Sequence, residues 1–360
     1  MRNQKIIGLA LLFCDVLFLS CSYSRAEPPA KQPSTTSPML FFCTDAKDGV
    51  WATRFLQDES GEGTFEDPIP FVCKPNSDSN LESFAAFRSG DGKFYRFFAA
   101  SILDFFEYDG CWVKKGALTG NQINLSVIDK DGNAWLSGNL KPHSTTKYIR
   151  KLGTSTDFST IPGVDTGGLT IYNDNQPGVQ YVMFGVIPNP PRNKQQPAIE
   201  APYLSLRKVI TPRAGEPTVE EKASLYPREV HFDGGQVADY MFPAFTSIDT
   251  IDGVEQLTIG WTKHQGPQYP TRCTRFKFAD LLSHEPGKTI NGIEIGKAIV
   301  SDQLTGMTVL PSGQVIGSFG DMICNLTTGE TYERPMGMGK FKFIQQAVSA
   351  PPQIEPSKPR

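Results

Sequence analysis

The sequence predicts an all-β fold, and within that class a β-propeller of roughly five to seven blades with a Pro-rich insertion. The segment 128–138, IDKDGNAWLSG, joins a polar Asp-Gly turn to a short strand that carries a Trp, and degraded copies of it recur along the chain. A turn–strand unit repeated every several tens of residues is typical of radial β repetition. The 33 Gly and 28 Pro residues also predict many tight turns and little long helix.

Residues 1–26 have the pattern of an export signal. Arg2 and Lys5 form a positive start, and the apolar stretch 6–19 is too short to span a bilayer comfortably. Two processing sites compete. Small residues before Glu27 favour cleavage at that point, whereas the segment 18–21, FLSC, resembles a bacterial lipobox with Cys21 as the lipid-bearing residue.

Residues 27–38 form a polar, Pro-rich linker that we expect to be disordered. Such a segment suits a tether between a lipid anchor and a folded body, and it equally suits an ordinary free N-terminus. Either processing site predicts an extracytoplasmic protein that is secreted, periplasmic or lipid-anchored at the cell surface. A membrane tether through the lipid is one of these alternatives.

Five cysteines follow the signal, namely Cys43, Cys73, Cys111, Cys273 and Cys324. In an oxidising compartment they are candidates for disulfides before they are candidates for metal ligands. Their order along the chain suggests Cys43 with Cys73 and Cys273 with Cys324, although sequence alone does not fix the connectivity.

The propeller domain is predicted to occupy residues 39–345, where short strands alternate with turn signals. An Asp-Gly pair between two aromatic or β-branched runs favours a hairpin, because both residues tolerate positive φ. The principal turns are Asp48-Gly49, Asp91-Gly92, Asp131-Gly132, Gly178, Asp233-Gly234 and Ser312-Gly313. Propeller blades span about 40–50 residues, which gives the predicted number of blades. A pair of β-sandwiches or an irregular β fold is the alternative.

Two segments interrupt or end this rhythm. The stretch 186–197 is a Pro-rich excursion, and it is followed by a predicted strand over 203–210. Thr218 and Glu221 have the spacing of a capping box, which predicts one short helix there. Residues 346–360 form a second Pro-rich segment, predicted to be a disordered tail.

The segment 129–138, DKDGNAWLSG, resembles the repeat of two-component-regulator-type β-propellers, close to D-x-x-G-N-L-W-x-G. The resemblance covers about ten residues and implies that Trp135 is a buried residue on the second strand of a hairpin. A fainter similarity links the segments 91–98 and 65–68 to five-bladed glycoside hydrolases.

Composition and motifs exclude several classes of chemistry. With 35 basic and 38 acidic residues and no basic run, nucleic acid is not an expected partner. The four histidines are isolated and no C-x-x-C occurs, so neither a metal site nor a cofactor is predicted. A G-x-S-x-G nucleophile elbow is also absent. Asp45, Asp67 and Glu229 are the carboxylates considered for catalysis, against the ordinary role of such residues in turns.

These features predict an exported, non-catalytic binding or scaffold propeller whose ligand is an unknown protein or carbohydrate. The alternative is a carbohydrate-active hydrolase with a carboxylate pair in the central funnel. A funnel lined by two or three acids with Trp or Tyr favours the enzyme. A lining of small neutral residues favours the binding protein.

Overall fold

The computed structural model describes residues 37–349 apart from short gaps at 47–48, 58–62, 76–80, 82, 89–94, 101–103, 118–122, 130, 140–145, 152–156, 163, 189–200, 212–216, 264–268, 297–298 and 302. The predicted signal, Cys21, the linker up to residue 36 and residues 350–360 therefore lie outside the described residues. The described residues from Pro38 onwards belong to one compact unit.

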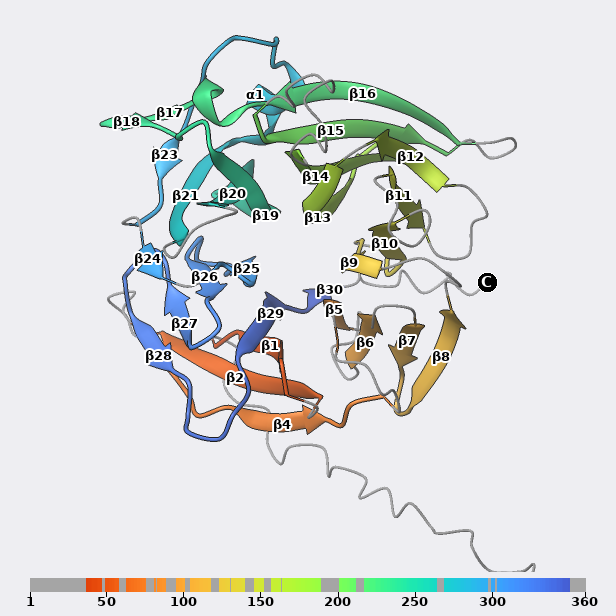
Figure 1. Ribbon diagram of the computed structural model, residues 1–360, viewed down its shortest axis with the longest axis vertical. Coiled ribbons are helices and arrows are strands. Elements are labelled where there is room, and N and C mark those ends of the chain that lie inside the picture. The colour runs from red at the N-terminus through yellow and green to blue at the C-terminus, as the bar shows by residue number, and fades with distance from the viewer. Residues whose placement is uncertain are drawn as a thin grey trace, which may run out of the picture. The chain divides into compact units, whose positions relative to one another are not determined.

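The described part of this unit contains six sheets of four or five strands that surround a common centre, as in a propeller (Figure 1). Blade 1 combines β29 (Phe341–Gln346), β1 (Met39–Thr44), β2 (Val50–Gln57), β3 (Gly63–Phe65) and β4 (Ile69–Val72). Blade 2 combines β5 (Ser83–Arg88), β6 (Tyr95–Ala100), β7 (Asp104–Tyr108), β8 (Trp112–Ala117) and β30 (Val348–Ser349). Blade 3 combines β9 (Ile123–Ile128), β10 (Ala134–Asn139), β11 (Thr146–Lys151) and β12 (Asp157–Pro162).

The second half of the chain supplies the other three blades. Blade 4 combines β13 (Val164–Asn173), β14 (Val179–Pro188), β15 (Tyr203–Ile210) and β16 (Thr218–Leu225). Blade 5 combines β19 (Met241–Ile251), β20 (Val254–Lys263), β21 (Tyr269–Lys277), β23 (Ile293–Glu294) and β24 (Ile299–Ser301). Blade 6 combines β25 (Gly306–Val309), β26 (Val315–Ser318), β27 (Met322–Asn325) and β28 (Thr331–Glu333). The predicted β-propeller is thus confirmed, and six blades fall within the predicted range.

The ring closes by pairing the two ends of the domain. The late strand β29 lies beside the first strand β1 and is the innermost strand of blade 1, with Leu40 opposite Gln346 and Thr44 opposite Phe341. The chain then reaches the next blade, where β30 pairs with β5. The predicted domain end at residue 345 falls inside β29, and the described strands continue to Ser349. This pairing joins the last part of the chain to the first blade, and the radial arrangement leaves only short sheet edges.

Among the described Asp-Gly hairpins, the one at Asp252-Gly253 has positive φ at both residues, whereas at Asp131-Gly132 and Asp233-Gly234 only the Gly does; the predicted turn Asp91-Gly92 and Asp48 lie outside the described residues. Asp252 and Gly253 have φ of 51° and 76°, so both take the left-handed conformation that a two-residue hairpin between twisted strands requires. One predicted blade turn is wrong. The Asp233-Gly234 pair joins β17 (Val230–Phe232) to β18 (Gly235–Gln236) in a small separate sheet with β22 (Ile290–Asn291), and Asp252-Gly253 makes the inner hairpin of blade 5.

The helix predicted from Thr218 is also wrong, because these residues form β16, the outer strand of blade 4. Glu220 lies opposite Lys208 and Val219 opposite Val209, so cross-strand pairing with β15 prevails over the local capping pattern. The capping box forms a few residues later instead, at the 3-10 helix η1 (Pro227–Glu229), where Glu229 accepts a bond from the backbone of Tyr226. The strand predicted over 203–210 is confirmed as β15.

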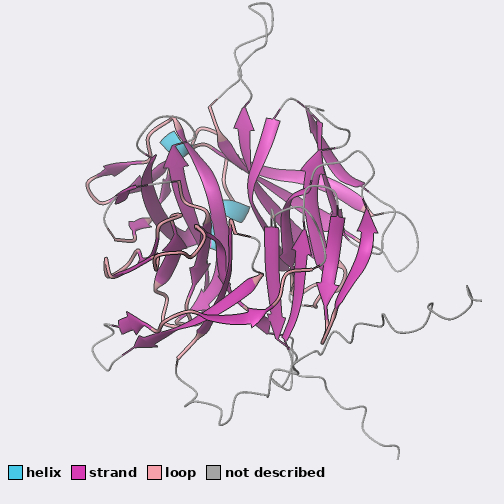
Figure 2. Ribbon diagram, turned by 60° about the horizontal axis from the view of Figure 1, so that its bottom comes forward, coloured by secondary structure: helices cyan, strands magenta, loops and turns pink. Residues whose placement is uncertain are grey.

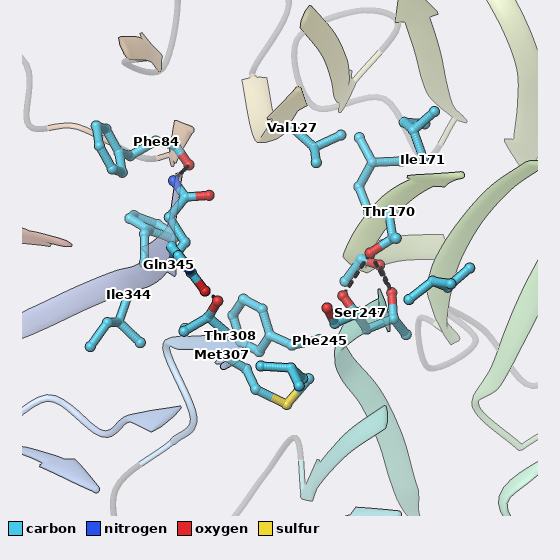
Figure 3. Close-up of a pocket in the computed structure, with 18 of the residues that line it drawn as sticks. Phe84, Val127, Thr170, Ile171, Phe245, Ser247, Met307, Thr308, Ile344 and Gln345 are labelled. Carbon is cyan, nitrogen blue, oxygen red and sulfur yellow. Dashed lines mark hydrogen bonds between the residues drawn. The ribbon is translucent and has the colours of Figure 1, made fainter. Parts of the chain in front are cut away.

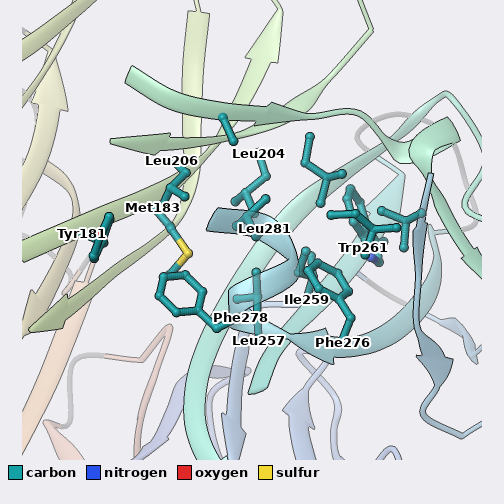
Figure 4. Packing of buried hydrophobic residues seen from close by; sticks show 14 of the residues in the cluster. Tyr181, Met183, Leu204, Leu206, Leu257, Ile259, Trp261, Phe276, Phe278 and Leu281 are labelled. Atoms are coloured by element: carbon teal, nitrogen blue, oxygen red, sulfur yellow. The ribbon is translucent and has the colours of Figure 1, made fainter. Parts of the chain in front are cut away.

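The core lies mainly in the seams between blades. The largest cluster joins blade 4 to blade 5 around Met183, Leu206, Ile259 and Trp261, and α1 (Phe278–Leu282) inserts Phe278 into it (Figure 4). Figure 2 shows the strands of neighbouring blades standing side by side around the ring. None of the helices in the described part of the chain is long and apolar enough to cross a membrane.

Candidate functional site

A cavity of about 300 Å³ lies at the centre of the ring, where the innermost strands of all six blades meet. Its wall is contributed by β5, β9, β13, β19, β25 and β29, together with Ala347 (Figure 3). We call this cavity the central channel. No other described feature gathers residues from every blade, so the channel is the natural candidate for a shared site.

The lining of the channel is almost entirely neutral. Among the described residues that line it, none is Lys, Arg, His, Tyr or Trp, and Asp249 is the single carboxylate. Ser247 donates a hydrogen bond to Asp249 Oδ2 at 2.6 Å. The remaining lining residues are aliphatic, Phe, Met, Ser, Thr, Gly and Gln.

A buried guanidinium, that of Arg275, interacts electrostatically with Asp249. Arg275, on β21, is 7% exposed; its Nε donates to Thr258 Oγ1 at 2.9 Å and its Nη2 to the carbonyl of Gly313 in blade 6 at 2.6 Å. Burial lowers the pKa of the Arg275 guanidinium, and the negative charge of Asp249 acts in the opposite direction. The only charge on the described channel wall is therefore partly balanced from inside the protein.

Some hydroxyl groups of the wall fasten one blade to the next. Thr246 of blade 5 donates to the carbonyl of Gly168 at 2.7 Å and lies 2.7 Å from the hydroxyl of Thr170, both in blade 4. Thr170 in turn donates to the carbonyl of Thr246 at 2.7 Å. This part of the wall is structural.

The opposite part of the wall carries amides and a hydroxyl with remaining hydrogen-bonding capacity. Gln345 Nε2 donates to the carbonyl of Phe84 at 2.7 Å, which leaves its Oε1 as an acceptor. Thr308 Oγ1 accepts the backbone N–H of Gln346 at 3.1 Å, and its own O–H is still a donor. Gln345, Thr308 and Ser247 are all drawn around the channel in Figure 3.

One channel residue has an unusual backbone. Phe343, on β29, has φ of +55°, a conformation that costs a bulky residue about 1–2 kcal/mol. Its backbone approaches Gly306 so closely that a Cβ on Gly306 would meet Phe343 Cα at 2.8 Å and Ile344 N at 2.3 Å. Strain of this kind concentrates at functional sites, so it marks this side of the channel.

The carboxylates considered from sequence lie elsewhere, and each has a structural role. Asp45 Oδ1 accepts the backbone N–H of Lys340 at 2.6 Å and so holds the segment that leads into β29. Asp67 accepts the hydroxyl of Tyr332 at 3.0 Å; burial, and then this carboxylate, raise the pKa of Tyr332 to about 12. Neither residue lines the central channel.

Glu229 is 5% exposed, and its carboxylate makes three polar contacts. Its two carboxylate oxygens accept the backbone N–H groups of Gly287 at 2.7 Å and Tyr226 at 2.8 Å, and the second faces His284 Nε2 at 3.2 Å. These bonds join η1 to the loop after α1. None of Asp45, Asp67 and Glu229 lines the central channel, so no two of them form a carboxylate pair in the funnel.

The predicted disulfides are not formed in the structure, in which Cys73, Cys273 and Cys324 are free thiols. Cys43 is buried in β1 whereas Cys73 is exposed beyond β4, so the two lie in unlike surroundings. Cys273 and Cys324 are 2% and 1% exposed in the apolar seam between blades 5 and 6. Burial raises the pKa of Cys273 to about 12 and that of Cys324 to about 11, which keeps both as neutral thiols.

The repeat-like segment around Trp135 has a role that sequence reasoning recognised only in part. Trp135 is 0% exposed on β10 and packs with Leu169, Ile171 and Phe184 of blade 4, so its predicted burial is confirmed. What was missed is Asp129, a 0% exposed carboxylate whose Oδ2 accepts the indole N–H of Trp135 at 2.9 Å. The six-residue spacing of Asp and Trp is the sequence signal for this bond.

Within the described ranges, no group of three or more His, Cys, Asp or Glu side chains is placed to hold a metal ion. No family model matches the sequence, and no curated protein matches it.

Several solved structures resemble the chain at low identity. Drosophila Plexin A in complex with Semaphorin 1b is 11% identical, with a TM-score of 0.41 over 86% of this chain and 79% of that one. A functionally unknown protein from Desulfotomaculum acetoxidans is 10% identical, with a TM-score of 0.40 over 87% and 100%. The six-bladed β-propeller lectin of the fungus Aleuria aurantia is 13% identical, with a TM-score of 0.35 over 84% and 98%.

Proposed function

We propose that this chain is an exported, non-catalytic β-propeller that acts as a binding or scaffold module. The observation that carries the proposal is the lining of the central channel, in which Asp249 is the single carboxylate among described residues that are otherwise neutral. Glycoside hydrolysis needs two carboxyl groups about 5–9.5 Å apart. The hydrolase alternative has no such support from this lining.

The proposal that the chain is exported rests on the N-terminal sequence, with its basic start and apolar stretch before Glu27 and Cys21. We further propose that the segment 129–138 is a blade repeat of the two-component-regulator type. Its support is the bond between Asp129 and the Trp135 indole, which gives a physical reason for that spacing. Mass spectrometry of the exported chain should find Glu27 or lipidated Cys21 as the first residue. Retention of Met1 would contradict export by either route.

The non-catalytic role can be tested with a panel of 4-nitrophenyl glycosides and the purified mature chain. We expect no turnover above a protein-free control, because a single carboxylate does not supply both an acid and a base or nucleophile. Turnover that is lost in the Asp249→Asn variant would contradict the proposal and restore the hydrolase alternative.

A further inference from the structure

We infer that the central channel binds a small, neutral, polyhydroxylated ligand of monosaccharide size. This inference rests on the proposed function, since it assigns a ligand class to the same channel. Four features of the channel wall support it, namely its volume, its hydrogen-bonding groups, its charge balance and its aromatic residues.

The volume sets the size of the ligand. Pockets for small molecules hold about 300–1,000 Å³, and the channel lies at the lower end of that range. A single sugar ring fits this space, whereas a folded protein segment or a long glycan does not. A free monosaccharide and the terminal unit of a glycan share this chemistry.

The hydrogen-bonding groups match a ligand that carries several hydroxyls. Thr308 is 8% exposed and keeps a donor, Gln345 keeps an acceptor, and Asp249 lies beside Ser247 across the channel. Hydroxyl groups both donate and accept, so one polyol can satisfy all of these positions at once. A wall that offers donors and acceptors from different blades selects such a ligand over an apolar one.

The charge balance selects a neutral ligand. No basic side chain lines the described wall, so an anion would find no cationic partner there. Asp249 is the single acid, and the buried guanidinium of Arg275 opposes its charge. A cation would therefore gain less from Asp249 than from an isolated carboxylate.

Aromatic residues complete the match. Phe245 and Phe343 line the channel; both are partly buried and also pack against the hydrophobic clusters behind the wall. The C–H face of a sugar ring packs well on such rings. Phe343 occupies this position although a positive φ is costly for a bulky residue.

Methyl NMR of the full mature chain with labelled methionine tests the inference. Met307 lines the channel, whereas Met336 is fully exposed and serves as an internal control. The probes are glucose, galactose, mannose, fucose and N-acetylglucosamine, each with its methyl glycoside and one disaccharide, beside glucosamine and glucuronate as charged analogues. We expect a saturable shift of the Met307 methyl with at least one neutral sugar, weaker binding of both charged analogues and no shift at Met336. Shifts with the disaccharide identify a glycan end, and shifts with the monosaccharide alone identify a free sugar.

Two variants locate the binding. Thr308→Val removes one neutral hydrogen bond and should weaken binding about 2- to 12-fold. Asp249→Asn keeps an acceptor and should change the affinity for a neutral sugar less than it changes that for glucosamine. Thr331→Val, on the exposed outer strand β28 of the same blade as Thr308, is the matched control and should bind like the parent.

The inference is overturned if no neutral sugar shifts Met307, if a charged analogue binds more tightly, or if the Thr331 variant weakens binding as much as the Thr308 variant. These outcomes leave the non-catalytic proposal standing, because that proposal fails only on turnover of a glycoside. Turnover of a glycoside together with a saturable Met307 shift would contradict the non-catalytic proposal and leave the sugar-binding inference standing.

Discussion

Two aspartates in this propeller differ in their surroundings, since one is buried between two blades and the other lines the central channel. Asp129, in the seam between blades 3 and 4, is 0% exposed and accepts bonds from the backbone N–H groups of Asp131 and Asn133 and from the side chains of Asn133, Trp135 and Gln180. Asp249, on the channel wall, is partly exposed and has Ser247 as its hydroxyl donor. A carboxylate surrounded by donors fixes a turn. One that lines a cavity lies where a bound ligand would contact it.

The seam should be the more sensitive region, and Trp135→Ala should have the largest effect. The substitution removes a fully buried side chain from the contact between blades 3 and 4 and should lower the free energy of unfolding by about 3–5 kcal/mol. Denaturant unfolding followed by circular dichroism measures the change.

Trp112→Ala is the matched control for that variant. Trp112 is partly exposed on the outer strand β8, and its indole N–H donates to the carbonyl of Cys73. We expect a smaller loss than for Trp135→Ala, because less buried area is removed. Equal losses at both positions would contradict a special role of the seam.

Phe343 provides a smaller test on the channel side. At its φ of +55°, Gly is unstrained and Ala is not, so Phe343→Gly should be more stable than Phe343→Ala by about 1–2 kcal/mol. In an ordinary strand the order is reversed, by about 0.5–1 kcal/mol. Thermal unfolding of the two variants side by side decides the matter, and an Ala variant at least as stable as the Gly variant would mean that the strained backbone is not present.

Alkylation of the cysteines tests whether the seam between blades 5 and 6 is buried. The effect of these thiols on stability at neutral pH is expected to be very small. At pH 8 the exposed Cys73 and Cys111 should be alkylated quickly, and the buried Cys273 and Cys324 should stay unlabelled because thiolate is the reactive form. The raised pKa values of Cys273 and Cys324 make a contribution to folded-state stability that is fully present below pH 9, the ordinary pKa of a thiol. This contribution declines as the pH rises towards 12, because only the unfolded chain then releases the protons.

Peptide mass spectrometry reads the labelling position by position. Labelling of Cys273 as fast as Cys73 would contradict the buried seam. If a pair of cysteines stays unlabelled after denaturation without reductant, the disulfides expected from sequence exist after all.

The sequence predicted those features of the fold that depend on local chemistry. Asp-Gly pairs favour hairpins through local backbone conformation, so the hairpin at Asp131-Gly132 could be identified directly. The assignment of Asp233-Gly234 to a blade was wrong because a hairpin signal does not say which sheet its strands join. The helix expected at Thr218 was wrong because pairing with β15, a non-local contact, decides its conformation.

The channel could not have been found in this way. Its wall takes a few residues from each of six strands far apart in sequence, and none of these stretches carries a motif. Phe84 and Gln345, far apart in sequence, line the same cavity because β29 returns to pair with β1 at the start of the domain. The buried bond of Asp129 lay closer to prediction, since Asp129 and Trp135 belong to one short segment.

A direct test of the contrast between seam and channel is to make the same substitution at both aspartates. Asp129→Asn places an amide where donors already surround the oxygens, so it should cost about 1.5–3 kcal/mol of unfolding free energy. Asp249→Asn should lower that free energy by less than Asp129→Asn does, because Asp249 is partly exposed and Asn keeps an oxygen that can accept from Ser247. Parallel urea titrations of the two variants and the parent give both numbers in one experiment. A larger loss at Asp249 than at Asp129 would contradict the account.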